Sequence, residues 1–427
     1  MIFSRSMVVC LLLIFLGLAG CRPDAAPTST AIPATSTALP SPSVTVSPSP
    51  TATSSPVPTP TPISIPTPTS TLEVWVSYWP SGQTPSLRGY SPNQITALVV
   101  APSDGQTVYA ATWAALFRSI DGGKNWTMVN SLPNLEADFI VLTRALAVDP
   151  LNRDSLFAYF WPKAKAVDAP PELKGFKKST DGGRSWSDPS SGASADLMGL
   201  VNTLVVNPSN PNIIMVGTDR YNQKSSRILR STDGGATWQV TYTIDPVMGV
   251  GNITTIAIHP TSPNIVYAGH KVYHGGSVIR SDDGGISWRF TATVPMPLSY
   301  PVGLALDPSD PNVVYVAYQA LVAAGVAVYK SSDGGQSWIK ASSGLPEGTA
   351  GAGQLIIDPS DPKVLFFAIQ GLNGGIYITR DGADSWVRLT PDDAPQFAHV
   401  TSLSYSASEH TLFAGTNEGV WQSRLPP

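Results

Sequence analysis

One eight-residue pattern occurs six times in this 427-residue chain and restricts the fold more than any other feature. The regular copies read Ser-x-Asp-Gly-Gly-x-x-Trp and begin at Ser119, Ser179, Ser231, Ser281 and Ser331, and a sixth copy, TRDGADSW, begins at Thr379. We call each copy a box. The Asp residues of successive boxes are 60, 52, 50, 50 and 48 residues apart. A repeat of about fifty residues is typical of a propeller or a solenoid.

A second repeat lies between the boxes. An apolar run, a turn rich in Pro, Asn, Asp and Ser, and another apolar run recur seven times, at 98–112, 146–160, 204–218, 256–269, 304–318, 355–369 and 403–416. This pattern predicts a β-hairpin. A short third strand such as 327–331 then precedes the box, and a fourth such as 338–342 begins at the box Trp. Four strands per repeat predict an all-β fold, a single seven-bladed β-propeller over residues 72–427.

The two ends of this domain are expected to complete one blade together. Seven hairpins accompany only six boxes, and residues 72–82 resemble the sequence that follows a box. We therefore expect residues 72–79 to supply the fourth strand of the blade whose first three strands lie at 402–424. Such closure removes the open sheet edges that invite aggregation.

The box has the composition of a tight turn. Adjacent glycines permit positive φ, the Asp carboxylate can accept hydrogen bonds from turn amides, and the Trp can cover the turn. Because a folding element is needed once per blade and a catalytic group only once, we expect a structural role for these residues. They are Asp121, Trp126, Asp181, Trp186, Asp233, Trp238, Asp283, Trp288, Asp333, Trp338, Asp381 and Trp386. Ala383 replaces the second Gly in the sixth box, so we expect a looser turn there.

The box resembles the Asp-box, or bacterial neuraminidase repeat, of sialidases, xyloglucanases, the sortilin ectodomain and a photosystem II assembly factor. The resemblance extends over most of residues 72–427 and implies the propeller fold. It leaves the function open, because those relatives include glycosidases, a receptor and an assembly chaperone.

The first 71 residues indicate export. Residues 1–21 carry Arg5, an apolar run over 7–18 and then small residues before a Cys, which is typical of a signal peptide. Leu18-Ala19-Gly20-Cys21 resembles the lipobox of bacterial lipoproteins, which implies acylation of Cys21 and a lipid-anchored, extracytoplasmic protein. An ordinary signal peptide or an N-terminal membrane anchor is the alternative. Residues 22–71 are rich in Pro, Ser and Thr, which predicts a disordered stalk.

Composition excludes several kinds of chemistry. The only two cysteines are Cys10 and Cys21, so residues 72–427 hold no thiolate ligand and no Cys nucleophile. The formal net charge is −4 with no polybasic stretch, which argues against nucleic acid as a partner. His270 and His274 lie close together in an expected loop, but no third ligand can be named, so we expect no metal site. We expect no cofactor and a monomeric protein.

Two kinds of glycosidase activity are alternative functions for this sequence. A sialidase needs a cluster of arginines, whereas Arg118, Lys178, Arg230, Arg280 and Lys330 each directly precede a box Ser and should therefore ring the propeller. Other glycoside hydrolases need two carboxylates about 5–10 Å apart. The acids outside boxes and hairpin turns include Glu136, Asp138, Asp168, Glu172, Asp196, Asp219, Asp245, Glu347, Asp392 and Glu418. The sequence nominates no pair among them, so the catalytic residues of such an enzyme stay unknown.

A binding site is expected on the loop face, the end of the propeller where the loops joining strands two to three and four to one emerge, opposite the box end. Length varies most there, at 160–174, 218–226 and 270–276. Trp161, Tyr221, Tyr273 and His274 are the candidate contacts for a sugar ring or a partner side chain. The leading hypothesis is a non-catalytic binding or assembly module for a protein or glycan. The alternatives are a xyloglucanase-like or sialidase-like glycoside hydrolase and a purely architectural surface protein.

Overall fold

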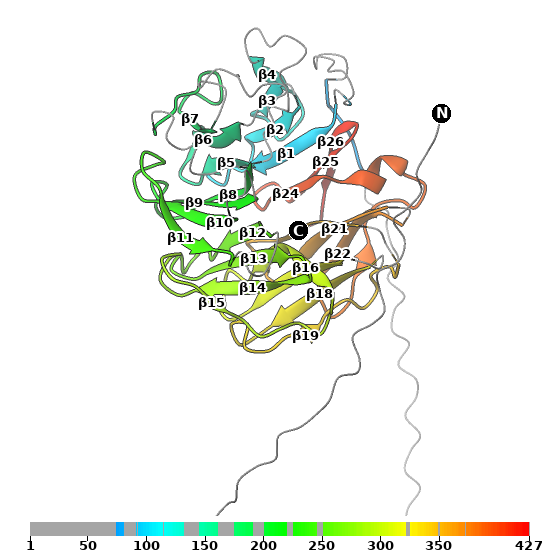
Figure 1. Cartoon of the computed structure of the whole chain (residues 1–427). Coiled ribbons are helices and arrows are strands. Elements are labelled where there is room, and N and C mark those ends of the chain that lie inside the picture. Colours follow the sequence, from blue (N-terminus) through cyan, green and yellow to red (C-terminus); the bar gives the residue numbers. More distant parts are fainter. Residues whose placement is uncertain are drawn as a thin grey trace, which may run out of the picture. The chain divides into compact units, whose positions relative to one another are not determined.

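The chain divides into two units, residues 1–67 and 68–427. The computed structural model describes residues 74–80, 91, 93–113, 115–131, 145–160, 175–190, 200–219, 225–245, 251–321, 325–348, 351–371 and 373–426, all of them in the second unit. These residues form antiparallel strands and one 3-10 helix, η3 (Pro395–His399), and contain no α-helix (Figure 1). The predicted all-β class is confirmed. No helix among the described residues is long and apolar enough to span a membrane.

Five of the seven groups of described strands follow the predicted order of hairpin, third strand, box and fourth strand, whereas the second and the last have three strands. In the second group, Lys178 and Ser187 form only an isolated bridge after the box. The first three groups are β1 (Ile95–Val100), β2 (Val108–Thr112), β3 (Ala115–Ser119) and β4 (Thr127–Ser131); β5 (Ala145–Asp149), β6 (Asn152–Phe160) and β7 (Gly175–Ser179); and β8 (Leu200–Val206), β9 (Ile214–Asp219), β10 (Arg227–Ser231) and β11 (Gln239–Thr243). The next two are β12 (Asn252–Ile258), β13 (Val266–Val272), β14 (Gly275–Ser281) and β15 (Arg289–Phe290); and β16 (Ser299–Leu306), β17 (Val314–Ala320), β18 (Val326–Ser331) and β19 (Ile339–Lys340). The last two are β20 (Gly351–Ile357), β21 (Leu365–Gln370), β22 (Gly375–Thr379) and β23 (Val387–Arg388); and β24 (Ser402–Ser406), β25 (Thr411–Thr416) and β26 (Gly419–Arg424).

The core lies between neighbouring sheets. Strands β2, β9 and β17 begin with runs of five buried residues, because a second strand is covered by a sheet on each face. One cluster joins Tyr109 and Leu116 of the first sheet to Leu156 and Phe160 of the second. Another joins Tyr267 and Val278 to residues of β16–β18. This double coverage explains why the hairpins read as continuous apolar runs with no alternation.

The first strand of each group lies toward a common centre (Figure 1). β1 contacts both β5 and β24, and each of the other first strands contacts the first strands before and after it in the order β5, β8, β12, β16, β20, β24. This is the arrangement of a β-propeller.

The N-terminal segment joins the last sheet. Val76 N donates to Gln422 O at 2.9 Å, and Gln422 N donates to Val76 O at 2.8 Å. Trp79 packs in one cluster with Val420 and with Phe117 of β3. A seven-bladed ring that is closed by its N-terminal strand requires these contacts. The blade count and the ring closure remain predictions.

Each box forms one hydrogen-bonded turn. In the fifth box, Ser331 Oγ donates to Asp333 Oδ1 at 2.7 Å and accepts from Gly335 N at 2.8 Å, while Asp333 Oδ1 also accepts from Ser337 N at 2.9 Å. Gly335 has a φ of 87°, a conformation that costs glycine little. The carboxylate and hydroxyl thus take up amides that a reversing chain leaves without backbone partners.

The sixth box contradicts the expectation of a looser turn. Ala383 N donates to Thr379 Oγ1 at 3.0 Å, and Asp381 Oδ1 accepts from Ser385 N at 2.9 Å, as in the regular boxes. Ala383 is fully buried and adopts the left-handed φ of 74°. The same hydrogen bonds and the packing of the Ala methyl group hold the turn in a conformation that disfavours a Cβ atom.

The basic residues before the boxes connect neighbouring sheets. Arg230 Nε donates to Gly284 O at 2.8 Å, Arg280 Nη1 to Gly334 O at 3.2 Å, and Lys330 Nζ to Gly382 O at 3.1 Å. In each case the acceptor belongs to the box of the following group of strands. These cations are therefore distributed around the second unit and do not meet in one pocket.

Candidate functional site

A cavity of about 560 Å³ lies where the first strands converge. Its lining comes from the first strands, from the residue before β24 and from the end of β21: Thr96, Ala97, Leu98, Val99, Ala145, Leu146, Asn202, Thr203, Leu204, Thr254, Thr255, Val302, Ala352, Gly353, Gln354, Gln370, Thr401 and Ser402. The four-to-one connections enter the first strands at this end, and β21 leaves there for β22. Gln370 at the end of β21 and Thr401 just before β24 place one end of the cavity toward the loop face.

β-bulges shape the wall of this cavity. The pairing of first with second strands shifts register at one equivalent place in β1, β8, β12, β16 and β20. The residues at these shifts all line the cavity: Thr96, Asn202, Thr254, Val302, Gly353 and Gln354. A bulge turns an extra side chain away from the regular alternation of a strand. Because the bulge recurs at the equivalent place in five first strands, the shape of the wall is a regular feature of the fold.

Side-chain amides tie the wall together. Asn202 Nδ2 donates to Ile253 O at 3.3 Å on the next first strand, and Gln354 Oε1 accepts from Leu403 N at 2.8 Å. Gln370 Nε2 donates to the backbone O of Val400 at 3.0 Å. Each amide thus bonds to a neighbouring element through one of its two polar atoms.

The polar chemistry of the wall is neutral. None of the described lining residues carries a formal charge, and its polar groups are hydroxyls and carboxamides. Ser402 is 7% exposed, and its Oγ has no hydrogen-bond partner among the described residues. A buried hydroxyl without a partner is uncommon. This Oγ has no access to solvent and packs against Gly415, so it does not contribute a polar group to the cavity.

Two of the predicted contact residues lie on the rim of the loop face. Tyr273 and His274 form the turn between β13 and β14, and their rings meet edge to face at 4.8 Å between centroids. Tyr273 is 72% exposed. Close by in sequence, Lys271 Nζ lies 3.9 Å from the centroid of the Tyr300 ring. Trp161, Tyr221 and the lipidation candidate Cys21 lie outside the described residues.

His270 does not lie in a loop as expected. It belongs to β13 and is buried, with ring contacts to Tyr242 and Phe290, because the hairpin turn begins only after Val272. Neither ring nitrogen has a hydrogen-bond partner in the described part of the chain. Burial lowers the pKa of His270 to about 4, which keeps the ring neutral at physiological pH. The described residues contain no group of three or more metal-ligating side chains.

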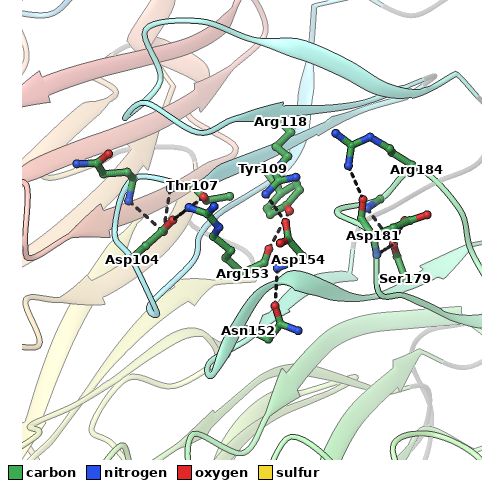
Figure 2. Close-up of polar contacts among 12 residues, drawn as sticks. Asp104, Thr107, Tyr109, Arg118, Asn152, Arg153, Asp154, Ser179, Asp181 and Arg184 are labelled. Carbon is green, nitrogen blue, oxygen red and sulfur yellow. Dashed lines mark hydrogen bonds and ion pairs between the residues drawn. The ribbon is translucent and has the colours of Figure 1, made fainter.

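A second cavity, of about 580 Å³, lies at the box end between the first two sheets. Figure 2 shows the polar contacts of Arg118, Asp154 and Asp181, which line it, and of nearby residues. Its charged groups largely neutralise one another: Arg118 pairs with Asp154, and Arg153 pairs with Asp104 at 2.8 Å. Burial tends to raise the pKa of Asp181, but hydrogen bonds led by that from Ser185 outweigh it and lower this pKa to about 2. These carboxylates are engaged in structural hydrogen bonds and ion pairs, which is a poor arrangement for acid or base catalysis.

Sequence reasoning missed the wall of the first cavity. Asn202, Gln354 and Ser402 were not among the candidate residues, although a signal exists. Polar residues recur one or two places before the apolar run that opens several of the hairpins, as in Thr254-Thr255 and Thr401-Ser402. An alignment of the repeats extended two residues upstream would have found them.

Comparisons with known proteins show the fold. No family model matches the sequence, and no curated protein matches it. The GH74 xyloglucanase from Xanthomonas campestris is similar in structure, with a TM-score of 0.61 and 21% identity over 82% of this chain and 53% of that chain. YCF48 from Cyanidioschyzon merolae has a TM-score of 0.56 and 15% identity over 82% and 98%, and a structure of YCF48 bound to D1 peptide has 0.55 and 14% over 83% and 97%. The chain spans about half the length of the xyloglucanase. These neighbours confirm the β-propeller fold.

Proposed function

We propose that this chain is a non-catalytic binding or assembly module that recognises a protein or glycan through its loop face. The observation that carries the proposal is the cavity among the first strands, whose bulged wall presents neutral hydroxyls and amides. Such groups hold and orient a ligand by hydrogen bonds but supply neither a nucleophilic carboxylate nor a proton donor of suitable pKa.

The fold neighbours support a binding role for a unit of this size. A YCF48 structure similar to nearly the whole of the second unit has a D1 peptide bound. We propose that the boxes are Asp-boxes and that the unit acts as a monomer, with no cofactor and no nucleic acid as partner. All described residues that line the cavity come from one chain.

A glycoside hydrolase is the second candidate, favoured by the structural similarity to the GH74 xyloglucanase. It would require two carboxylates facing one cleft. Five of the loop acids lie among the described residues: Asp219, Asp245, Glu347, Asp392 and Glu418. None of these five lines the cavity, and Asp392 pairs with Arg388 at 2.7 Å. The described geometry therefore favours binding over hydrolysis.

We propose further that Cys21 is acylated and anchors the protein outside the cytoplasm, with residues 22–71 as a stalk. The composition of the first 71 residues supports this. Expression of the Cys21→Ser variant should move the protein from the membrane fraction to the soluble extracytoplasmic fraction and abolish its labelling with a fatty-acid analogue. Labelling that persists in the variant would refute the lipid anchor.

The main test separates binding from hydrolysis. The full-length protein is incubated with a broad panel of polysaccharides and sialoglycans, and the release of reducing sugar is measured together with retention on the same immobilised glycans and on cell-surface proteins. We expect retention without turnover. Retention should be weaker for Tyr273→Ala, because this variant removes an exposed ring from the loop face. The variant should still fold, because that ring contributes little to the fold. Turnover that disappears on substitution of a loop carboxylate would establish the hydrolase instead.

A further inference from the structure

We infer that a patch on the loop face binds a peptide segment of another protein in which a carboxylate adjoins an aliphatic or aromatic side chain. We call it the Leu298 patch. Its members lie on the β13–β14 hairpin, at the entry to β16 and just after β17: Lys271, Tyr273, Leu298, Tyr300 and Leu321. This inference rests on the proposed binding function and names the class of partner.

Backbone contacts bring the three connections of the Leu298 patch together. Leu321 N donates to Leu298 O at 2.7 Å, so the residue after β17 lies beside the segment that enters β16. The β13–β14 turn lies against the same segment, because a Cβ atom on Gly275 would lie 3.2 Å from Ser299 O. These connections join second to third strands or fourth to first strands, and they therefore emerge on the loop face.

Leu298 adopts a conformation that does not suit its side chain. Its φ of 51° lies in the left-handed region, where a Cβ atom is disfavoured and glycine is common. Ala383 also has a positive φ, but its methyl group is fully buried, whereas Leu298 is 48% exposed. Strained backbone residues cluster at functional sites. A partner that covers Leu298 would supply the contacts that its side chain lacks.

Apolar surface gathers around Leu298. Tyr273 is 72% exposed, and Tyr300 and Leu321 are half-buried. Single large apolar side chains on a surface need no explanation, but several at one place mark an interaction site. Tyrosine is enriched where one protein binds another.

Lys271 selects the charge of the partner. It forms no ion pair and no hydrogen bond with another described residue, and its ammonium is in contact with solvent. The ammonium lies over the Tyr300 ring, 3.9 Å from the ring centroid, which holds it at the patch. None of the other four members carries a formal charge. A carboxylate is the group that matches the ammonium donors best.

A peptide suits the Leu298 patch better than a sugar does. The hydroxyl groups of a sugar would lose their water against the side chains of Leu298 and Leu321, which offer no hydrogen bond in return. The Lys271 ammonium already covers one face of the Tyr300 ring. Apolar side chains of a peptide lose no hydrogen bonds on this surface, and an adjoining carboxylate pairs with Lys271.

Leu298→Gly is the decisive variant. Glycine tolerates the φ of 51°, so the urea midpoint of unfolding should stay the same or rise, while a partner loses the Leu side chain. We expect the dissociation constant to increase about tenfold. Leu151→Ala is the control, because Leu151 is 63% exposed and lies in the β5–β6 turn at the box end. This control should bind as the unaltered protein does.

Lys271→Met tests the charge, because it removes the ammonium and keeps a long side chain. With a peptide that carries Glu beside Leu, the dissociation constant should increase roughly threefold to fivefold. With the Gln version of this peptide it should not change, because the lost interaction needs both charges. Lys340→Met is the control, because Lys340 is exposed on the outer strand β19.

The probes separate a peptide from the other occupants. The full-length protein and these variants are applied to immobilised peptides in which Leu or Phe adjoins Glu, to the same peptides with Gln or Lys in place of Glu, and to oligosaccharides bearing uronic acids. Calorimetry then gives the dissociation constants of the retained probes. Sedimentation analysis of the protein alone shows whether a second copy occupies the patch.

A preference for the Glu peptides that weakens in Leu298→Gly and Lys271→Met, but in neither control, supports the inference. Equal retention of Glu and Gln peptides, equal binding by all variants, or a preference for the oligosaccharides overturns it, as does self-association that Leu298→Gly abolishes. Oligosaccharides retained without turnover would leave the proposed binding function intact and refute only the peptide. Turnover of a glycan with no retention of any probe would overturn both.

Discussion

Val76 and Gln422, from opposite ends of the described chain, exchange two backbone hydrogen bonds of 2.9 and 2.8 Å. Ser77 Oγ adds a bond of 2.8 Å to Val420 O, and the Trp79 ring packs over Gly419. The last sheet is thereby extended by a segment that precedes the first sheet in sequence. The stability of the whole ring should depend on this junction.

Val76→Pro tests the junction directly. Proline removes the N–H that donates to Gln422 and should destabilise the unit by about 1–3 kcal/mol. Unfolding by urea, followed by tryptophan fluorescence, should remain one cooperative transition with a lower midpoint. Val74→Pro is the control, because Val74 is 75% exposed and has no described hydrogen bond. A Val76→Pro protein that unfolds like the original would show that the ends do not close a ring.

Arg280→Ala tests the links between sheets. Arg280 is 8% exposed and donates both to Tyr267 Oη at 2.8 Å and to Gly334 O of the following box at 3.2 Å. Its loss leaves two acceptors without their charged donor and should cost about 2–3 kcal/mol. Differential scanning calorimetry measures the shift.

The matched control for Arg280 is Arg289→Ala. Arg289 pairs with Asp282, as Arg280 does, but it is half-exposed. Exposed ion pairs contribute about 1 kcal/mol or less. Equal losses in the two variants would contradict the role assigned to the contact between sheets.

His270 should make the protein sensitive to mild acid. Burial holds its pKa at about 4 in the folded state, below the value of about 6.5 expected when the chain is unfolded. Between these values the unfolded chain binds a proton that the folded chain refuses, so stability should fall as pH decreases from about 6.5 to 4. The total loss is on the order of 3 kcal/mol, at about 1.4 kcal/mol per pH unit.

His270→Phe should remove this dependence, since a Phe ring can occupy the site between Tyr242 and Phe290 without titrating. Urea unfolding at pH 7, 6, 5 and 4 gives the comparison. His274→Phe, in the adjoining turn, should keep the slope of the original protein. A slope that survives in His270→Phe would assign the acid sensitivity to other groups.

The stabilising hydrogen bonds of the box Asp should be lost at a lower pH than the one at which His270 affects stability. Hydrogen bonds from Ser337, the largest cause, and from Ser331 lower the pKa of Asp333 to about 2, while an unfolded Asp titrates near 3.9. The stabilisation is therefore complete above about pH 4 and is lost as the pH falls toward 2. Carboxyl carbon NMR should give this low pKa and a higher value in Ser337→Ala. An unchanged value would remove the Ser337 bond as its cause.

The sequence by itself determined the all-β class, the hairpins and the place of each box between a third and a fourth strand. These features depend on neighbours only a few residues apart: turn residues, adjacent glycines and runs of apolar side chains. It also indicated where the N-terminal segment should pair. The sequence also predicted that the cations before the boxes are distributed around the propeller, because each occupies the same position in its repeat.

Tertiary structure decided the rest. His270 and His274 are four residues apart and were expected in one loop, yet one is buried in β13 and the other lies in the turn. Ser402 and Ser423 are both buried and both without a described partner, and only Ser402 belongs to the residues that line the cavity. Local sequence cannot separate them, because the wall arises from bulges on first strands that lie about fifty residues apart and meet only when the sheets pack around a common centre.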